Sequence, residues 1–289
     1  MGHLTYFLAS WDLDPVATEV VLLTGLAYTW GIRQVARNGS GRPWARRRTA
    51  FFMTGLGLWY FVTVGPIGTY DDVFFWAHMV QHLITMMVVA PLLLLGSPVL
   101  LILQVAPRQI RHRWLVPLLR SRFNRYLSNP VLTWLLFAGT LIGTHFSPFY
   151  NYAVTHPLVH DYIEHPLYLA VALLYFYPLV GGNPLPHGPS PLTKVVSLVL
   201  QMGPESMTGF FIYTATQVMY PAYLVSSRPF GPDPLLDQQI GGALMWCSGM
   251  VIDAIWIAVA VRGWLQAEAR KGRQIDRTIA AEQAREAKR

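Results

Sequence analysis

Long apolar runs alternate with short polar connectors along most of this chain. A run of roughly 20 apolar residues is long enough to cross the hydrocarbon core of a bilayer as a helix. Seven such runs predict transmembrane helices over Val16–Ala36, Thr49–Gly68, Phe74–Leu95, Val131–Ser147, Val159–Val180, Lys194–Val218 and Ile240–Arg262. The pattern therefore indicates an all-α polytopic integral membrane protein, built as a seven-transmembrane-helix bundle.

Basic residues between the apolar runs set the expected orientation. All but one of the 22 Lys and Arg residues fall on one side of the predicted bundle, and the exception is Arg228. The positive-inside rule places the N-terminus outside and the C-terminus in the cytoplasm. The chain then divides into a seven-span transmembrane domain, residues 1–262, and a charged cytoplasmic tail, residues 263–289.

The composition agrees with a membrane location and narrows the chemistry. Hydrophobic residues make up 53% of the chain and charged residues only 13%, about half the charged fraction of a soluble domain. The net charge of +7 is explained by the topology, so we expect a lipid bilayer as partner and no nucleic acid. The single cysteine, Cys247, excludes an intramolecular disulfide and a CxxC metal site.

Histidines gather at one depth of the predicted bundle. His78, His82 and Met86 are spaced i, i+4 and i+8, so they share one face of a helix. Six of the nine histidines fall at the outer ends of the third, fourth and fifth spans, and Glu164 lies one turn after His160. Ionisable groups inside a membrane are costly and are typical of functional sites. We predict a metal site with these ligands: His78, His82, Met86, His145, His156, His160, Glu164 and His165.

The predicted donors narrow the choice of metal. Imidazole combined with thioether suits copper, Cu(I) in particular, whereas imidazole combined with carboxylate suits zinc. Copper is our prediction, and zinc and haem are the alternatives that the residues leave open. Neutral imidazole is the form that binds a metal, so binding is expected to weaken as the pH falls through about 6.5.

Four other polar residues stand out in the last two spans. Glu205 and Asp253 fall inside apolar runs, where they serve either as an intramembrane polar relay or as an interhelical hydrogen bond. Asp237 and Gln238 come at the outer start of the last span. An Asp at that position is typical of a helix N-cap, so we predict that Asp237 caps the helix; contact with a partner protein is the alternative.

Three segments resemble the hallmarks of one known family. HMVQHLITMMVVAPLLLLGSPV (His78–Val99) contains HMxQH, an apolar stretch and a Leu-Gly-x-Pro turn. HFSPFYNYAVTHPLVHDYIEHPLYL (His145–Leu169) has an outer His, a tyrosine run and a His…Glu-His helix start. YPAYLV…LLDQQIGGALMW (Tyr220–Trp246) ends in Asp-Gln-Gln-x-Gly-Gly-x-x-Met-Trp. In this order the segments resemble the polytopic CtaG family, the bacterial cytochrome c oxidase assembly factors.

This resemblance implies a multi-pass protein of the bacterial plasma (inner) membrane that is not an enzyme. Its role would be to help build an active cytochrome c oxidase, a haem–copper oxidase. Together with the geometry of the histidines, this predicts a metallochaperone that binds copper at an outer-leaflet His cluster and aids its delivery to subunits of the oxidase. The positions that match the family's motifs are His78, Gln81, His82, His145, His156, His160, Glu164, His165, Asp237 and Gln238.

Two other functions fit the same residues. Bis-His ligation would make the chain a membrane haem-binding electron-transfer protein. An HxxxH pair with a further His and an acid would hold zinc in an intramembrane zinc-dependent hydrolase, with a metal-activated water. A homo-oligomer is compatible with each of these functions.

Overall fold

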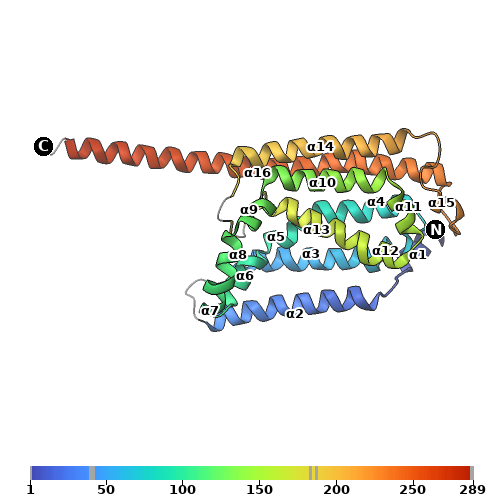
Figure 1. The fold of residues 1–289 in the computed structure, drawn as a ribbon, viewed down its shortest axis with the longest axis horizontal. Helices are drawn as coiled ribbons and strands as arrows, with labels where there is room; N and C mark the ends of the chain where they lie inside the picture. The colour runs from blue at the N-terminus through green and yellow to red at the C-terminus, as the bar shows by residue number, and fades with distance from the viewer. Residues whose placement is uncertain (1, 39–42, 182–183, 186–187, 287–289) are drawn as a thin grey trace.

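The chain folds into long helices that lie side by side, as the computed structural model shows (Figure 1). The structure describes residues 2–38, 43–181, 184–185 and 188–286, and these contain helices and no strand. In chain order the helices are α1 (Gly2–Ala9), α2 (Pro15–Arg37), α3 (Arg46–Val64), η1 (Gly68–Tyr70), α4 (Phe75–Ile84), η2 (Thr85–Val89), α5 (Ala90–Leu95), α6 (Pro98–Val105), α7 (Arg108–Ile110), η3 (Arg111–Leu115), α8 (Val116–Arg120), α9 (Arg122–Leu127), α10 (Pro130–His145), α11 (Pro148–Val154), α12 (Pro157–Val159), η4 (His160–Glu164), α13 (His165–Phe176), α14 (Pro191–Thr214), α15 (Ala222–Val225) and α16 (Pro234–Glu286).

Several of these helices are long and apolar enough to cross a membrane. Within the described residues there are five: Pro15–Arg37, Arg46–Tyr70, Phe75–Val105, Pro191–Thr214 and Pro234–Ala280. A sixth results if α10 and α11, which bend by 69° at a short break, count as one span. The run predicted over Val159–Val180 is helical but divided between α12, η4 and α13, so it is not among them. The prediction of an all-α membrane protein is confirmed.

One local signal starts most of the long helices. Asp14, Asn129, Ser147, Ser190 and Asp233 each accept a backbone N–H of the first turn that follows. Each of them also precedes a proline at the first helical position, where the missing N–H costs nothing. Cap and proline together therefore define where α2, α10, α11, α14 and α16 begin.

The cap of α16 corrects one prediction. Asp233, not Asp237, caps this helix, because its Oδ1 accepts the N–H groups of Leu235 and Leu236 at 3.1 Å each. Asp237 lies one turn further along and binds other backbone groups, described below. The helix then continues without a break to Glu286, so the predicted tail is a helical extension as far as the structure describes it; residues 287–289 lie outside the described part.

Within the described residues, three π-helical turns interrupt the helices, and each comes just before a proline. They are η2, η3 and η4, followed two residues later by Pro91, Pro117 and Pro166. A proline has no N–H to donate and its ring clashes with the carbonyl one turn earlier, so a wider turn relieves the clash. The Met87 carbonyl, left without its helical N–H, accepts Nε1–H of Trp256 at 2.7 Å.

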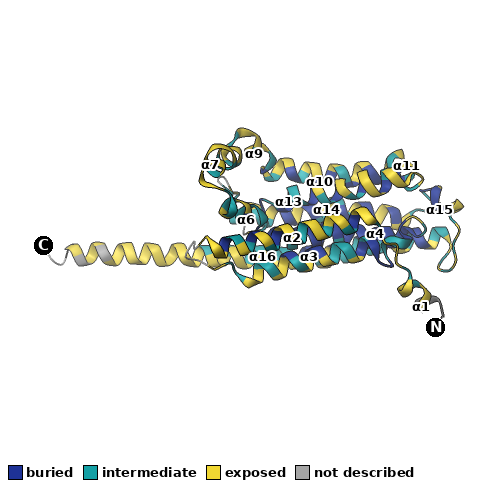
Figure 2. Ribbon diagram, turned by 90° about the horizontal axis from the view of Figure 1, so that it is seen from below, coloured by how far each residue is buried: buried dark blue, intermediate teal, exposed yellow. Residues whose placement is uncertain are grey.

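Helices α14 and α16 run against each other at close range. A Cβ built at Gly242 would lie 2.5 Å from the backbone nitrogen of Tyr213, and one at Gly209 would lie 2.7 Å from that of Trp246. Small residues permit such approach between membrane helices. Helix α2 lies at the opposite edge of the bundle (Figure 1), and exposed residues cover the far part of α16 (Figure 2).

We expect Gly242→Ala to destabilise the protein, because the added methyl group meets backbone rather than a flexible side chain. Overpacking of this kind costs about 1–3 kcal/mol, which thermal unfolding in detergent will detect as a lower Tm. The matched control is Gly139→Ala on α10, where a Cβ meets nothing within 4 Å. That change should leave the Tm unchanged or raise it. Equal Tm values for the two variants would contradict the close packing.

Candidate metal centre

Asp237 fixes the start of α4, the helix that carries the first two predicted ligands. The backbone of Phe74 is extended, with φ −120°, and the Asp237 carboxylate accepts the N–H groups of Phe75 at 2.9 Å and Trp76 at 3.0 Å. A negative charge at a helix N-terminus is favourable. Arg228 lies 3.0 Å from the same carboxylate and balances its buried charge. Helix α16 thereby sets the position of α4.

His78 and His82 face each other on α4. Their Nε2 atoms are in hydrogen-bond contact, and both side chains are buried. The Nε2 atom of His78 also lies 3.7 Å from Oε1 of Glu164. A neutral imidazole carries one N–H and one lone pair. Two facing ring nitrogens beside a carboxylate therefore form a donor set that a proton or a metal cation can complete.

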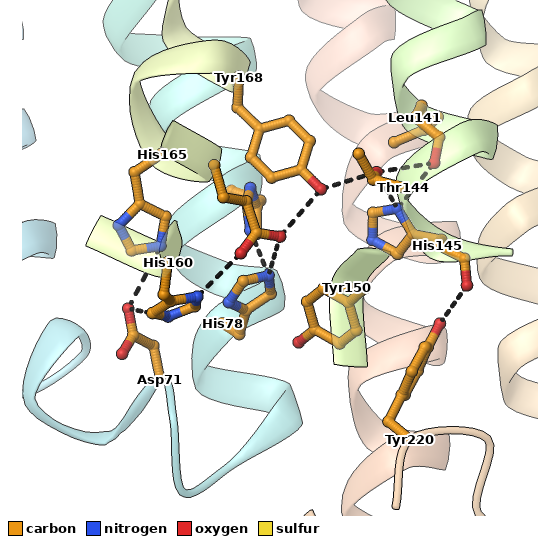
Figure 3. A network of polar contacts seen from close by, with 12 residues as sticks. Asp71, His78, Leu141, Thr144, His145, Tyr150, His160, His165, Tyr168 and Tyr220 are labelled. Atoms are coloured by element: carbon orange, nitrogen blue, oxygen red, sulfur yellow. Dashed lines mark hydrogen bonds and ion pairs between the residues drawn. The ribbon is translucent and has the colours of Figure 1, made fainter. Parts of the chain in front are cut away.

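The π-turn η4 brings three further side chains to the same place. His160 Nδ1 lies 2.8 Å from Oε2 of Glu164 and donates to it, which leaves the lone pair on Nε2. A π-turn has more residues per turn than an α-helix, so positions i, i+4 and i+5 share one side. His160, Glu164 and His165 occupy these positions; Glu164 is buried, and His160 and His165 lie beside His78 (Figure 3).

Asp71 joins the site from the loop before α4. Its Oδ2 lies 3.5 Å from Nε2 of His160 and 3.5 Å from Nε2 of His165. Asp71 was not among the ligands predicted from the sequence. No spacing in the sequence marks it, because the extended backbone of Phe74 separates it from the helix of His78, and its partners His160 and His165 lie in a distant segment.

The donor atoms form two groups that share His78. All atoms of a group lie within 4.8 Å of one another; the first group is Asp71, His78, His160 and His165, and the second is His78, His82 and Glu164. We call these six residues the histidine–carboxylate cluster. Five of the six were predicted as metal ligands, and the six come from two segments that are distant in the sequence, residues 71–82 and 160–165.

Three predicted ligands lie outside this cluster. His145 is buried at the end of α10, with its ring 6.4 Å from that of His82, and Nδ1 lies 2.8 Å from the Leu141 carbonyl. Met86 is buried one turn after His82. His156 is exposed, and its ring stacks on Tyr152 at 3.9 Å. The structure thus brings His145 and Met86 near the cluster and leaves His156 on the surface.

Tyrosine hydroxyls hold the cluster in place, and the sequence analysis did not single them out. Tyr168 donates its hydroxyl to Thr144 Oγ1 at 2.7 Å, with Glu164 Oε1 at 3.2 Å (Figure 3). Tyr223 donates to the backbone carbonyl of Asp71 at 2.8 Å, so the 2.7 Å contact between the Tyr150 and Tyr223 hydroxyls takes its proton from Tyr150. Each hydroxyl therefore fixes an element that carries a ligand.

An acidic groove borders the cluster on the side of α2. Its volume is about 830 Å³, and its lining includes His165 and these four acids: Asp12, Asp14, Asp71 and Asp161. In the loop outside the spans, burial and then the neighbouring Asp71 raise the pKa of the Asp72 carboxyl. Crowded carboxylates of this kind attract cations. The four acids therefore favour entry of a cation, rather than an anion, into the groove.

The remaining predicted residues take structural positions. Gln238 accepts the N–H of Met219 at 2.7 Å and donates to the Gln217 carbonyl at 3.2 Å, so it ties the loop after α14 to α16. Glu205 and Asp253 face each other across the α14–α16 interface, and both are buried. The two acids are therefore brought together, as either a relay or an interhelical hydrogen bond requires.

Fold and site define a polytopic helical membrane protein with a buried histidine–carboxylate cluster near one end of the bundle. The sequence model of the cytochrome c oxidase caa3 assembly factors (Caa3_CtaG) matches residues 26–267, most of the chain. The chain belongs to this family, and the predicted resemblance is confirmed.

The curated relatives are mycobacterial and longer. An uncharacterized protein of Mycobacterium leprae is 26% identical over 286 residues, which cover 95% of this chain and 42% of that protein. An uncharacterized protein of Mycobacterium bovis is 24% identical over 278 residues, covering 93% of this chain and 42% of that protein. The chain thus spans less than half the length of these relatives. No solved structure matches it.

We expect Asp237→Asn to destabilise the protein, because it leaves Arg228 without its buried partner and weakens the cap of α4. Hydrogen bonds to charged groups contribute about 1.5–3 kcal/mol, so the Tm in detergent should fall by several degrees. Asp233→Asn is the control, since Asn caps a helix about as well as Asp. If both variants unfold at the wild-type temperature, Asp237 does not hold α4.

Proposed function

We propose that this protein binds copper in the histidine–carboxylate cluster and passes it to a subunit of cytochrome c oxidase during assembly. Membership of the family indicates the process in which the protein acts, which is oxidase assembly. The observation that supports metal binding is the convergence of four imidazoles and two carboxylates. They form two overlapping groups, and the donor atoms of each group lie within 4.8 Å of one another. In this proposal copper is cargo, and the protein turns over no substrate.

Ring nitrogens without a hydrogen bond support a bound cation. His78 Nδ1, His160 Nε2 and His165 Nε2 are buried and make no hydrogen bond, although the last two lie 3.5 Å from Asp71 Oδ2. A buried polar atom without a partner costs about 1–3 kcal/mol, and such atoms are few in native proteins. A cation would satisfy several of them at once. Glu164 would then act on the ligand His160 as an orienting carboxylate, a common arrangement behind metal-bound histidine.

The topology that we propose has seven spans with the N-terminus outside. The chain ends lie at opposite ends of the bundle, as an odd number of crossings requires (Figure 1). The segment Pro157–Phe176, which is divided by η4, is the fifth crossing in chain order and brings the number of crossings to seven. The arginine-rich helices α7–α9 lie at the same end as the extension of α16, which supports a cytoplasmic location for that end. The cluster then faces the outside of the bacterial plasma membrane.

The geometry argues against a haem between the first two histidines. The rings of His78 and His82 have centroids 3.9 Å apart, and the two cavities that His82 lines have volumes of about 10 and 20 Å³. A porphyrin cannot enter that space. Zinc is the competing metal, because three imidazoles with a carboxylate, as in the group of Asp71, suit zinc as well. An active hydrolase would further need a coordination position open to water and substrate.

The proposal predicts that oxidase assembly depends on His160. In a bacterium deleted for its own copy of the gene, His160→Ala should fail to restore cytochrome c oxidase activity, because the ring that faces both Glu164 and Asp71 is lost. We expect oxidase activity in membranes to fall at least about tenfold, in proportion to the copper affinity that is lost. Oxidase copper content, measured in the same membranes, should fall with it.

His156→Ala is the matched control, because His156 is exposed and outside the cluster. It should restore activity as well as wild type, at equal protein level in the membrane. Full activity in the His160→Ala strain would contradict the proposed function, as would an oxidase that lacks activity but holds its full copper.

A further inference from the structure

A small cavity lies next to the histidine–carboxylate cluster, and four methionines are among the residues that line it. Its volume is about 20 Å³, enough for one ion or one water molecule. Two imidazoles and four methionines line it: His82, His145, Met79, Met86, Met87 and Met245. All four methionines are buried, although the chain has only ten. We call this space the methionine chamber.

The backbone explains why consecutive methionines reach the chamber. Met86 and Met87 lie in the π-turn η2, which widens the helix before Pro91. In a regular α-helix neighbouring side chains diverge by about a quarter of a turn or more, whereas a π-turn narrows that angle. Met79 reaches the chamber from the first half of the same helix, and Met245 from α16. The π-turn η2 therefore allows both Met86 and Met87 to line the chamber.

His145 offers the chamber a free lone pair. Its Nδ1 lies 2.8 Å from the backbone carbonyl of Leu141, and a carbonyl can only accept (Figure 3). Nδ1 therefore carries the proton of the neutral ring, and Nε2 carries the lone pair. His145 is 3% exposed, and its Nε2 has no hydrogen-bond partner. A ring fixed in this way by its backbone is typical of histidines that bind metals.

The donors of the chamber select for a soft ion of low charge. Thioether and imidazole are neutral, and thioether prefers Cu(I) over the harder divalent ions. Neutral donors in an apolar interior balance none of a metal's charge, so a monovalent ion is less costly there than a divalent one. Glu205 also lines the chamber. Divalent ions are better held by the carboxylates of the histidine–carboxylate cluster.

We propose that the methionine chamber is a second metal site, specific for Cu(I) and distinct from the histidine–carboxylate cluster. His82 lies in both donor sets, so the two sites are adjacent through one ring. The inference deepens the proposed function, since it rests on copper as the cargo. It assigns the bound copper the oxidation state Cu(I) and places that ion in the methionine chamber, away from the acidic groove.

The test is X-ray absorption and affinity for Cu(I), measured without oxygen on the full-length protein in detergent. Every sample carries Cys247→Ser, because that exposed thiol would itself bind Cu(I). Met86→Leu/Met245→Leu removes two sulfurs at nearly constant volume. Met207→Leu/Met250→Leu is the control, because these two methionines are exposed on α14 and α16.

We expect sulfur neighbours around Cu(I) in the parent and control proteins. In Met86→Leu/Met245→Leu the sulfur signal should disappear and the Cu(I) affinity should fall about tenfold or more, while Zn(II) binding by the cluster is unchanged. An unchanged sulfur signal and affinity in that variant would overturn the assignment of the chamber as a Cu(I) site. A parent protein whose Cu(I) has no sulfur neighbour would overturn it as well.

His160→Ala separates the chamber from the proposed function. It should weaken Zn(II) binding while keeping the sulfur signal of Cu(I), because His160 does not line the chamber. If the sulfur signal persists but His160→Ala still supports oxidase assembly in cells, the delivery role of the cluster fails and the chamber stands. If His160→Ala abolishes the sulfur signal, the chamber is not a distinct site and its assignment fails.

Discussion

The contact on which the site depends is the buried carboxylate of Asp237 at the N-terminus of α4. It satisfies two N–H groups that the helix itself cannot satisfy, and Arg228 balances its charge. This one side chain fixes both the position of α4 along α16 and the turn at which the histidine helix begins. A shift by one residue would rotate His78 out of the bundle by about 100°. The geometry of the histidine–carboxylate cluster is therefore set from a helix that contributes no residue to it.

Burial then makes the polar residues interdependent. Inside a helical membrane bundle, an imidazole or carboxylate without a partner is costly, so the groups converge upon one another. Glu164 accepts hydrogen bonds from His160 and Tyr168. Asp71 lies within ion-pair distance of His160 and His165, and Tyr223 donates to its backbone carbonyl. Nδ1 of His78 and Nε2 of His145 are buried and stay without a hydrogen-bond partner. A ligand bound to such an atom would satisfy it and so stabilise the folded protein.

Much of the fold and part of the site followed from the sequence. Apolar runs located the long helices, and the HxxxH spacing with the outer histidines identified five of the six cluster residues. The π-turns were missed, although Pro91 and Pro166 mark two of them, and these turns decide which side chains share a face. Asp71 and Asp237 could not be assigned, because each acts across a contact between distant segments. The tautomer of His145 also depends on a backbone hydrogen bond, which no sequence pattern reveals.

The most direct measurement is the metal content of the purified protein in detergent after loading with copper, by mass spectrometry, for wild type, His78→Ala/His82→Ala and His156→Ala. His78 belongs to both donor groups, whereas His156 belongs to neither. The account predicts near-stoichiometric copper or more in wild type and in His156→Ala, and a large loss in His78→Ala/His82→Ala. Copper that is absent from wild type, or retained in full by the double variant, would contradict it.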